Sequence, residues 1–108
     1  APRLASLVAQ RFASQSLRDE ALIERPQMVY LIRHRQNDPQ DLARGLALAV
    51  ENWRTQQEPP DAALLVEAAL ALNQPQAASP VLDWMQTTGY TDPTLAPLAQ
   101  TLRTRLGR

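Results

Sequence analysis

The stretch PPDAALLVEAALALNQPQ, residues 59–76, decides the fold of this chain. It starts with two prolines and Asp61, continues as a run rich in alanine and leucine, and ends in the polar turn Asn73-Gln74-Pro75. Aspartate is a good helix cap, and apolar residues three or four positions apart share one face of a helix. We therefore predict a helix that is capped by Asp61 and ends before the turn. Its inward residues are expected to be Leu64, Leu65, Ala68 and Leu72.

Three prolines mark a period in the chain. Pro26, Pro60 and Pro93 stand 34 and 33 residues apart, and each closes a polar stretch before a new helix-like run. The tetrapeptide NDPQ at 37–40 recurs as NQPQ at 73–76, about where a helical hairpin would turn. A period in this range is what stacked helix-turn-helix repeats produce.

The period divides the chain into four parts within one all-helical domain, residues 1–108. We expect leading helices over 1–25, hairpin repeats over 27–60 and 61–93, and a capping helix over 94–108.

The composition favours helices. Of the 108 residues, 44% are apolar but only 5% are aromatic, so leucine and alanine must supply the packing. Both are good helix formers, and no segment alternates with period two for long. A chain of this length buries about two-thirds of its unfolded surface, which is enough for one core. The fold class that we predict is all-α, with five to seven helices arranged as stacked antiparallel hairpins.

The second helix of the first hairpin has a clear start. Asp38 is a cap, and Pro39 suits the first helical position, where no N–H is needed. Gly45 is small enough to let a neighbouring helix approach closely. The face that we expect to point inward carries Leu42, Leu46, Val50 and Trp53.

Two segments leave alternatives open. The apolar run Met28–Ile32 has the length and residue types of a buried strand, but a helix is favoured because nothing else in the chain offers a strand partner. Pro80 is awkward within a helix from about Gln76 to Thr88. Either that helix starts late, with Ser79 as its cap, or it is kinked. Gly89 is expected to end it.

The two ends of the chain also read as helices. The first is predicted over 3–14, with a shorter one ending at Arg25, because the residue before a proline avoids the α region. One long bent helix over 3–25 is the alternative. Asp92 is expected to start the last helix. The apolar stripe of that helix comprises Leu95, Leu98, Ala99, Leu102 and Leu106.

Over about residues 27–107 the chain resembles the tetratricopeptide repeat family, whose units run about 34 residues. The residues that match the large, small and proline positions of that family are Tyr30, Leu64, Ala68 or Ala69, Pro60 and Pro93. Arg33 and His34 depart from it, since the family has an apolar and then a small residue there, and Val81 replaces an expected alanine. The second unit is therefore the better match.

The resemblance implies a protein-binding scaffold whose concave groove is lined by the first helix of each hairpin. The residues expected to face an extended segment or helix of a partner are Tyr30, Arg33, Leu65, Ala69 and Asn73. Arg33 and Asn73 are expected to hold a carboxylate or backbone group of that partner. Trp84 is expected at the boundary between hairpins, where it would anchor a partner, since Trp, Tyr and Arg dominate interface energetics. Trp53 is expected in the core.

The chain carries no catalytic signature. Basic and acidic residues number 11 each, so the net charge is zero and no long-range attraction for nucleic acid follows. Cysteine is absent, which excludes disulfides and thiolate metal sites. The single histidine, His34, has no nucleophile beside it, and no glycine-rich phosphate loop occurs. We expect no enzymatic activity, no cofactor, no metal and no nucleic-acid partner.

The function that we expect is a non-catalytic scaffold or adaptor that binds a peptide or partner protein. The alternative is an accessory or oligomerisation domain of a larger enzyme or membrane-associated protein, paired with another chain through the stripe on residues 95–106. All basic residues are arginine, which is typical of a GC-rich bacterial genome, and either the cytoplasm or the periplasm fits. No run of 18 apolar residues occurs, so no direct membrane insertion is expected. Because the chain starts at Ala1, we expect a domain cut from a longer protein.

Overall fold

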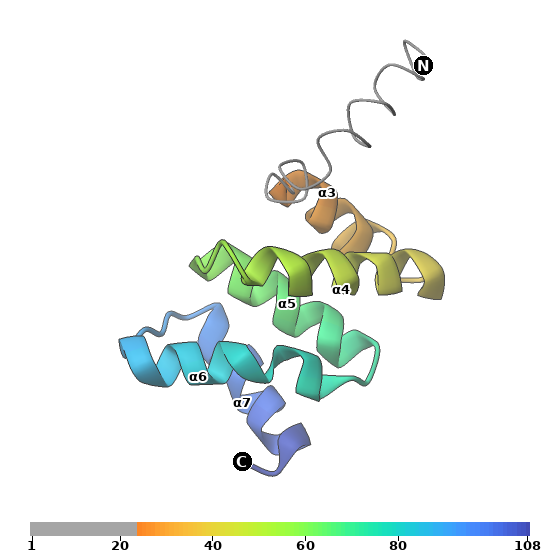
Figure 1. Ribbon diagram of the computed structural model, residues 1–108. Coiled ribbons are helices and arrows are strands. Elements are labelled where there is room, and N and C mark those ends of the chain that lie inside the picture. Colours follow the sequence, from red (N-terminus) through yellow and green to blue (C-terminus); the bar gives the residue numbers. More distant parts are fainter. Residues whose placement is uncertain (1–23) are drawn as a thin grey trace.

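The computed structural model describes residues 24–108, and every regular element among them is helical (Figure 1). The elements in chain order are α3 (Arg25–Val29), the π-helical turn η2 (Tyr30–His34), α4 (Pro39–Trp53), α5 (Pro59–Ala71), the 3₁₀ turn η3 (Pro75–Ala78), α6 (Ser79–Thr88) and α7 (Leu95–Leu106). The prediction of an all-α chain is confirmed for this part. The helix expected over 3–14 lies outside the described residues. Arg25 is the first residue of α3, so the prediction that it ends an earlier helix is wrong.

The run Met28–Ile32 is helical, as favoured over a strand. It starts in α3 and continues into η2, where the helix widens to the π form. Met28, Leu31 and Ile32 are buried, while Tyr30 between them is exposed. Helical geometry therefore satisfies the backbone of this apolar run without a strand partner.

Proline and aspartate set the starts of α4 and α5 in different ways. The Asp38 carboxylate accepts hydrogen bonds from the amides of Gln40 at 2.9 Å and Asp41 at 3.2 Å, so it caps α4 as predicted. At α5 the prediction that Asp61 is the cap is wrong. The helix already begins at Pro59, and Asp61 lies buried in its first turn.

The region around Pro80 follows the alternative of a late start, but Ser79 is the first residue of α6 and not its cap, so that part of the prediction is wrong. A 3₁₀ turn, η3, precedes α6, and Pro80 is the second residue of α6, where its missing N–H leaves no helical hydrogen bond unmade. Gly89 ends α6 in the left-handed conformation, with φ 72°, as expected. The Asp92 carboxylate accepts hydrogen bonds from the amides of Thr94 and Leu95, which fixes the turn that leads into α7.

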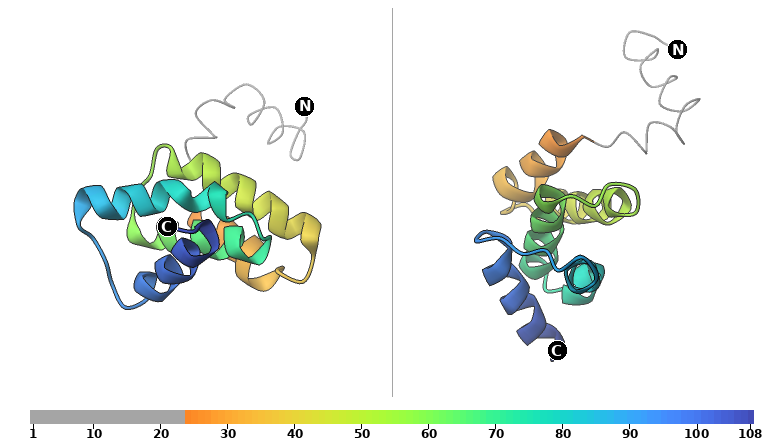
Figure 2. Two further views of the ribbon diagram at one scale, coloured as in Figure 1. Left: turned by 90° about the horizontal axis from the view of Figure 1, so that it is seen from below. Right: turned by 90° about the vertical axis from the view of Figure 1, so that its left-hand side faces the viewer.

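The helices form two layers (Figure 2, right). One layer contains α3 with η2, then α5, then α7, and the other contains α4 and α6, which this view shows nearly end-on. The central helix, α5, packs against every other helix of the described residues and against both η2 and η3. A helix surrounded in this way must be apolar on all its sides.

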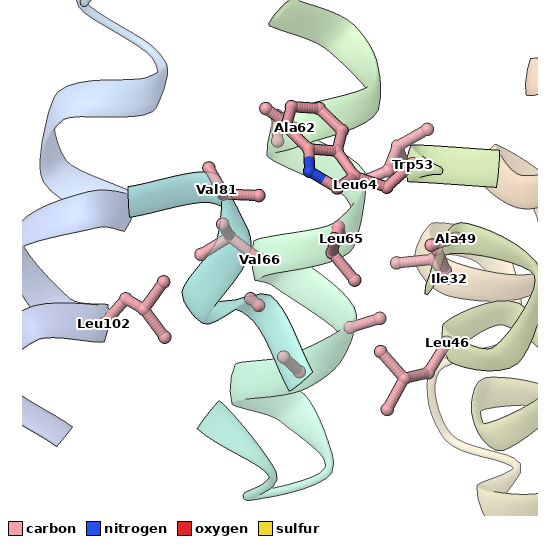
Figure 3. Packing of buried hydrophobic residues seen from close by; sticks show 14 of the residues in the cluster. Ile32, Leu46, Ala49, Trp53, Ala62, Leu64, Leu65, Val66, Val81 and Leu102 are labelled. Atoms are coloured by element: carbon pink, nitrogen blue, oxygen red, sulfur yellow. The ribbon is translucent and has the colours of Figure 1, made fainter. Parts of the chain in front are cut away.

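The sequence of α5 comes close to that condition, and its two charged residues, Asp61 and Glu67, are each paired with an arginine. Its first and middle turns are buried almost without interruption, at Asp61–Val66 and again at Ala68 and Ala69. Figure 3 shows α5 in the middle of the core, with Leu46 and Ala49 on one side and Val81 and Leu102 on the other. The small alanines let neighbours approach from several directions, and the leucines fill the space between them.

Two arginines link α3 and η2 to α5. Arg25 donates to both oxygens of the buried Asp61 carboxylate, at 3.1 and 3.0 Å, and also to Glu58 at 2.9 Å. Arg33 in η2 donates to both oxygens of Glu67, at 2.8 and 2.6 Å. Such fork-shaped pairs fix orientation as well as distance. They set the position of α3 and η2 along α5.

Helix α4 meets η2 at Gly45. A Cβ atom at this position would lie 2.7 Å from Cγ1 of Ile32 and 3.1 Å from Cβ of Leu31. These distances are shorter than ordinary van der Waals contact, so the close approach of α4 and η2 depends on the missing side chain.

We predict that Gly45→Ala lowers the free energy of unfolding. Alanine gains about 1 kcal/mol of helix propensity over glycine, but overpacking a core costs about 1–3 kcal/mol. Urea denaturation should therefore show a net loss. In an Ile32→Ala background, which removes the clashing atom, the same substitution should cost less. An increase of about 1 kcal/mol in the otherwise unchanged protein would contradict this account of the contact.

Candidate functional site

The six residues predicted to bind a partner do not lie on one surface. Tyr30, Arg33 and Asn73 are exposed on η2 and at the end of α5, and Trp84 is half-buried on α6 in the other layer. Leu65 and Ala69 are buried.

Leu65 and Ala69 do not present themselves to a partner. Ala69 has no exposed surface, and Leu65 is 1% exposed. The expectation that both residues present surface on the first helices is not met, because neighbouring helices cover Ala69 and Leu65 is reached only at the base of a groove between α4 and α6. In the sequence, Leu65 and Ala69 share one helical face with other apolar residues. That pattern does not show that the opposite face of α5 is covered as well.

Arg33 and Asn73 already have partners within the chain. The two hydrogen bonds to Glu67 raise the pKa of the Arg33 guanidinium, against the opposing effect of desolvation. A carboxylate from another protein would have to displace Glu67. The Asn73 side chain accepts from Arg105 at 3.4 Å, and its backbone is left-handed, with φ 57°, at the end of α5. Both residues thus connect successive helices of one layer.

Tyr30 is the most exposed large apolar side chain of the described residues, at 54%. Its ring stacks on that of His34 with centroids 6.4 Å apart and planes 26° apart. Both residues lie on the π-helical turn η2, and such turns are frequent at functional sites. In residues 24–108 no group of three or more His, Cys, Asp or Glu side chains is placed to hold a metal ion.

A groove lies between α4 and α6, with Leu65 of α5 at its base; we call it the α4–α6 groove. Its volume is about 450 Å³, and it is lined by Val50, Trp53, Arg54, Gln57, Leu65, Ala77, Pro80, Asp83, Trp84 and Thr87. The lining combines apolar side chains with a few polar ones at the edges, the pattern of sites that bind other molecules.

Three aromatic rings stiffen one end of the α4–α6 groove. Trp84 meets the buried Trp53 edge to face, with centroids 5.3 Å apart and planes at 85°. On its other side Trp84 contacts Tyr90, with centroids 5.4 Å apart. Edge-to-face and tilted contacts of this kind are worth about 0.5–1.5 kcal/mol beyond burial. Trp53 is in the core as predicted, and Trp84 is held at the surface.

The aromatic cluster continues into the start of α7. The Tyr90 hydroxyl donates to the Asp92 carboxylate at 2.6 Å, and this carboxylate also accepts from the amide of Leu95, likewise at 2.6 Å. The hydrogen bond from the Tyr90 hydroxyl makes the largest contribution to the lowered pKa of Asp92. The hydrogen bonds from the backbone amides lower that pKa further. The hydrogen bond from the hydroxyl also raises the pKa of Tyr90. The Tyr90 ring that contacts Trp84 is therefore linked through Asp92 to the start of α7.

Sequence reasoning missed one wall of the α4–α6 groove. Val50 was expected to point inward, but it is 39% exposed at the groove, and Ala49 is buried instead. The buried line of α4 runs through Leu46, Ala49 and Trp53, at spacings of three and four. Both sets of positions fit a helical period, and the prediction takes Val50 as the inward residue because it is larger than Ala49. An alanine inside is the signal that α5 approaches α4 closely.

Comparison with known protein families, with curated proteins and with solved structures finds no match for this chain. Within residues 24–108, no helix has both the length and the apolar character needed to cross a membrane.

We predict that the Asp92 carboxyl titrates below its ordinary pKa of about 3.9 and that Tyr90→Phe moves its midpoint upward. The reason is the loss of the hydroxyl donor that favours the charged form. A carboxyl whose pKa is lowered by folding stabilises the protein above its unfolded pKa and loses that effect as pH falls through its folded pKa. The Tyr90→Phe variant should thus be less stable near pH 7 and approach the parent protein in strong acid.

Carbon-detected NMR titration of the Asp92 carboxyl gives the midpoint directly. Asp83→Asn, an exposed change on α6, serves as the control and should leave it in place. An unchanged Asp92 midpoint in Tyr90→Phe would show that the hydroxyl contact does not form in solution.

Proposed function

We propose that this chain is a protein-interaction module built from two stacked helical hairpins and a capping helix, in the manner of tetratricopeptide repeats. It binds a segment of a partner protein in the α4–α6 groove. The first hairpin consists of α3, η2 and α4, and the second of α5, η3 and α6. The function is that of a scaffold or adaptor.

The pattern of helix contacts supports the stacked hairpins. Each helix packs on the next one in the chain, and the first helices of successive units also pack on each other, α3 and η2 on α5, and α5 on α7. The polar contacts between those first helices join residues 36, 34 and 32 positions apart: Arg25 with Asp61, Arg33 with Glu67, and Asn73 with Arg105. These intervals match the repeat period read from the prolines.

The helix α7 supports the capping role over the alternative of oligomerisation. The stripe that would pair with another chain is used inside this one, since Leu95, Ala99 and Leu102 have no exposed surface. The outward face of α7 is mainly polar or small, as expected of a terminal repeat that meets solvent.

The single observation that carries the site is Trp84 at the edge of the α4–α6 groove. A half-buried tryptophan beside an open apolar volume is a strong anchor for a partner, because its ring is already ordered and pays little entropy on binding. The exposed Val50 on the opposite wall adds apolar surface. The first-helix residues offer less, because Arg33 is paired and Leu65 and Ala69 are covered.

The experiment is selection of a phage-displayed library of random 12-residue peptides on the purified chain. Synthetic copies of the selected peptides are then measured by fluorescence polarisation. We expect Trp84→Ala to weaken binding by at least tenfold, since an interface hot spot is worth about 2 kcal/mol or more. Val50→Glu, which alters an exposed residue and leaves the core intact, should weaken it as well.

Tyr30→Ala is the matched control, because it removes an exposed aromatic ring that is not part of the groove lining. Binding that survives both groove variants but fails in Tyr30→Ala would move the site to η2. Circular dichroism must show that each variant keeps its helices.

A further inference from the structure

The charges at the edges of the α4–α6 groove indicate which chemistry a partner segment must have. Two charged side chains line the groove, Arg54 at the end of α4 and Asp83 on α6. They lie on opposite walls and differ in how far their charges are already neutralised.

Asp83 has a cation of its own. Arg108 donates to its carboxylate at 3.1 Å, from the end of the chain beyond α7. The α6 wall of the groove therefore presents a paired charge, and a cation from a partner would compete with Arg108 for it.

Arg54 is also paired, but through a longer contact. The only polar contact of its side chain with the described residues is one hydrogen bond to Glu51, at 3.4 Å, within the last turns of α4. Its side chain is 72% exposed. An exposed ion pair of this kind contributes between zero and about 1 kcal/mol, so little is lost when the guanidinium turns to another carboxylate. Arg25 and Arg33, in contrast, each bind a carboxylate through two hydrogen bonds.

Beside Arg54 lies Gln57, which also lines the groove and whose side chain makes no hydrogen bond to residues 24–108. The α4 wall thus offers a cation and a neutral amide next to the apolar base. A guanidinium and an amide together suit a carboxylate, since both donate hydrogen bonds to oxygen.

The size of the groove limits the occupant to a short segment. Its volume of about 450 Å³ lies in the lower part of the range of about 300–1,000 Å³ for pockets that enclose small molecules. It accommodates a few side chains of a partner and not a second folded surface.

We propose that the α4–α6 groove binds a short linear segment of a partner protein in which an apolar side chain is accompanied by a carboxylate. The apolar side chain packs on Trp84 and Val50, and the carboxylate pairs with Arg54. This inference rests on the proposed function and adds the charge of the partner and its orientation, with the acidic residue at the α4 wall.

The probes for the test are three sets of fluorescein-labelled 12-residue peptides that share a central Leu-Phe pair. Glu, Gln or Arg follows that pair, and the neighbouring positions are varied among Ala, Ser and Leu. Fluorescence polarisation at 50 mM and 300 mM salt gives their affinities. We expect the Glu set to bind more tightly than the Arg set by up to about fivefold, since an exposed pair is worth up to about 1 kcal/mol. The preference should shrink at the higher salt concentration.

Arg54→Glu should reverse the order, so that the Arg peptides bind more tightly than the Glu peptides. The matched control is Arg44→Glu on the same helix. Arg44 is 64% exposed and also pairs with an acidic residue three positions away, but it lies outside the groove lining. The Arg44→Glu variant should therefore keep the preference for the Glu peptides.

The outcomes separate the two proposals. Binding that depends on Trp84 but shows no preference among the three sets, or a preference for Arg, overturns the acidic partner and leaves the groove as the site. If no peptide of any set binds in a Trp84-dependent way, both the groove and its acidic partner are overturned. Equal effects of Arg54→Glu and Arg44→Glu would reduce the preference to net charge and overturn the pairing with Arg54.

Discussion

The structure depends on the burial of one helix, α5, over most of its surface. All the other helices of the described residues pack on it, so no part of residues 24–108 has a core of its own. The apolar contacts are supplied by alanine and leucine, whose small and medium sizes allow neighbours at short distances in every direction. A substitution in the middle of α5, at Leu65 for example, would open a cavity between two layers at once, and such cavities cost about 2–5 kcal/mol. Stability is thereby concentrated in the run of residues 59–76.

Polar residues have different roles on the two layers of helices. On the layer of α3, α5 and α7, arginines are paired with Asp61, Glu67 and Asn73, and these contacts set how successive helices lie against one another. On the layer of α4 and α6, the aromatic ring of Trp84 and the exposed side chain of Arg54 remain available to another molecule. The proposed binding site lies on the second layer, because these arginines of the first layer already pair with residues of neighbouring helices.

Much of the fold follows from local signals in the sequence. Asp38, Pro39 and Gly89 mark helix ends because their preferences act within a few residues, whatever surrounds them. The role of Asp61 did not follow, since an aspartate after two prolines fits a cap equally well, and only the position of Arg25 across the layer makes it a buried partner. Two residues that line the proposed site, Leu65 and Trp84, are among those that the sequence suggests for partner binding. Trp84 stands out by its residue type alone. Val50 and Arg54 line the proposed site because of the distance between α4 and α6, which no local pattern encodes.

Hydrogen exchange of the native protein tests the central role of α5 most directly. Amides that open only when the whole domain unfolds exchange with the free energy of global unfolding, while those of separable parts exchange at lower free energies. If α5 is the shared core, amides from Leu64 to Ala69 will exchange most slowly, with a free energy equal to that from urea denaturation. Exchange of these amides at a clearly lower free energy, with α4 or α6 better protected, would contradict the account.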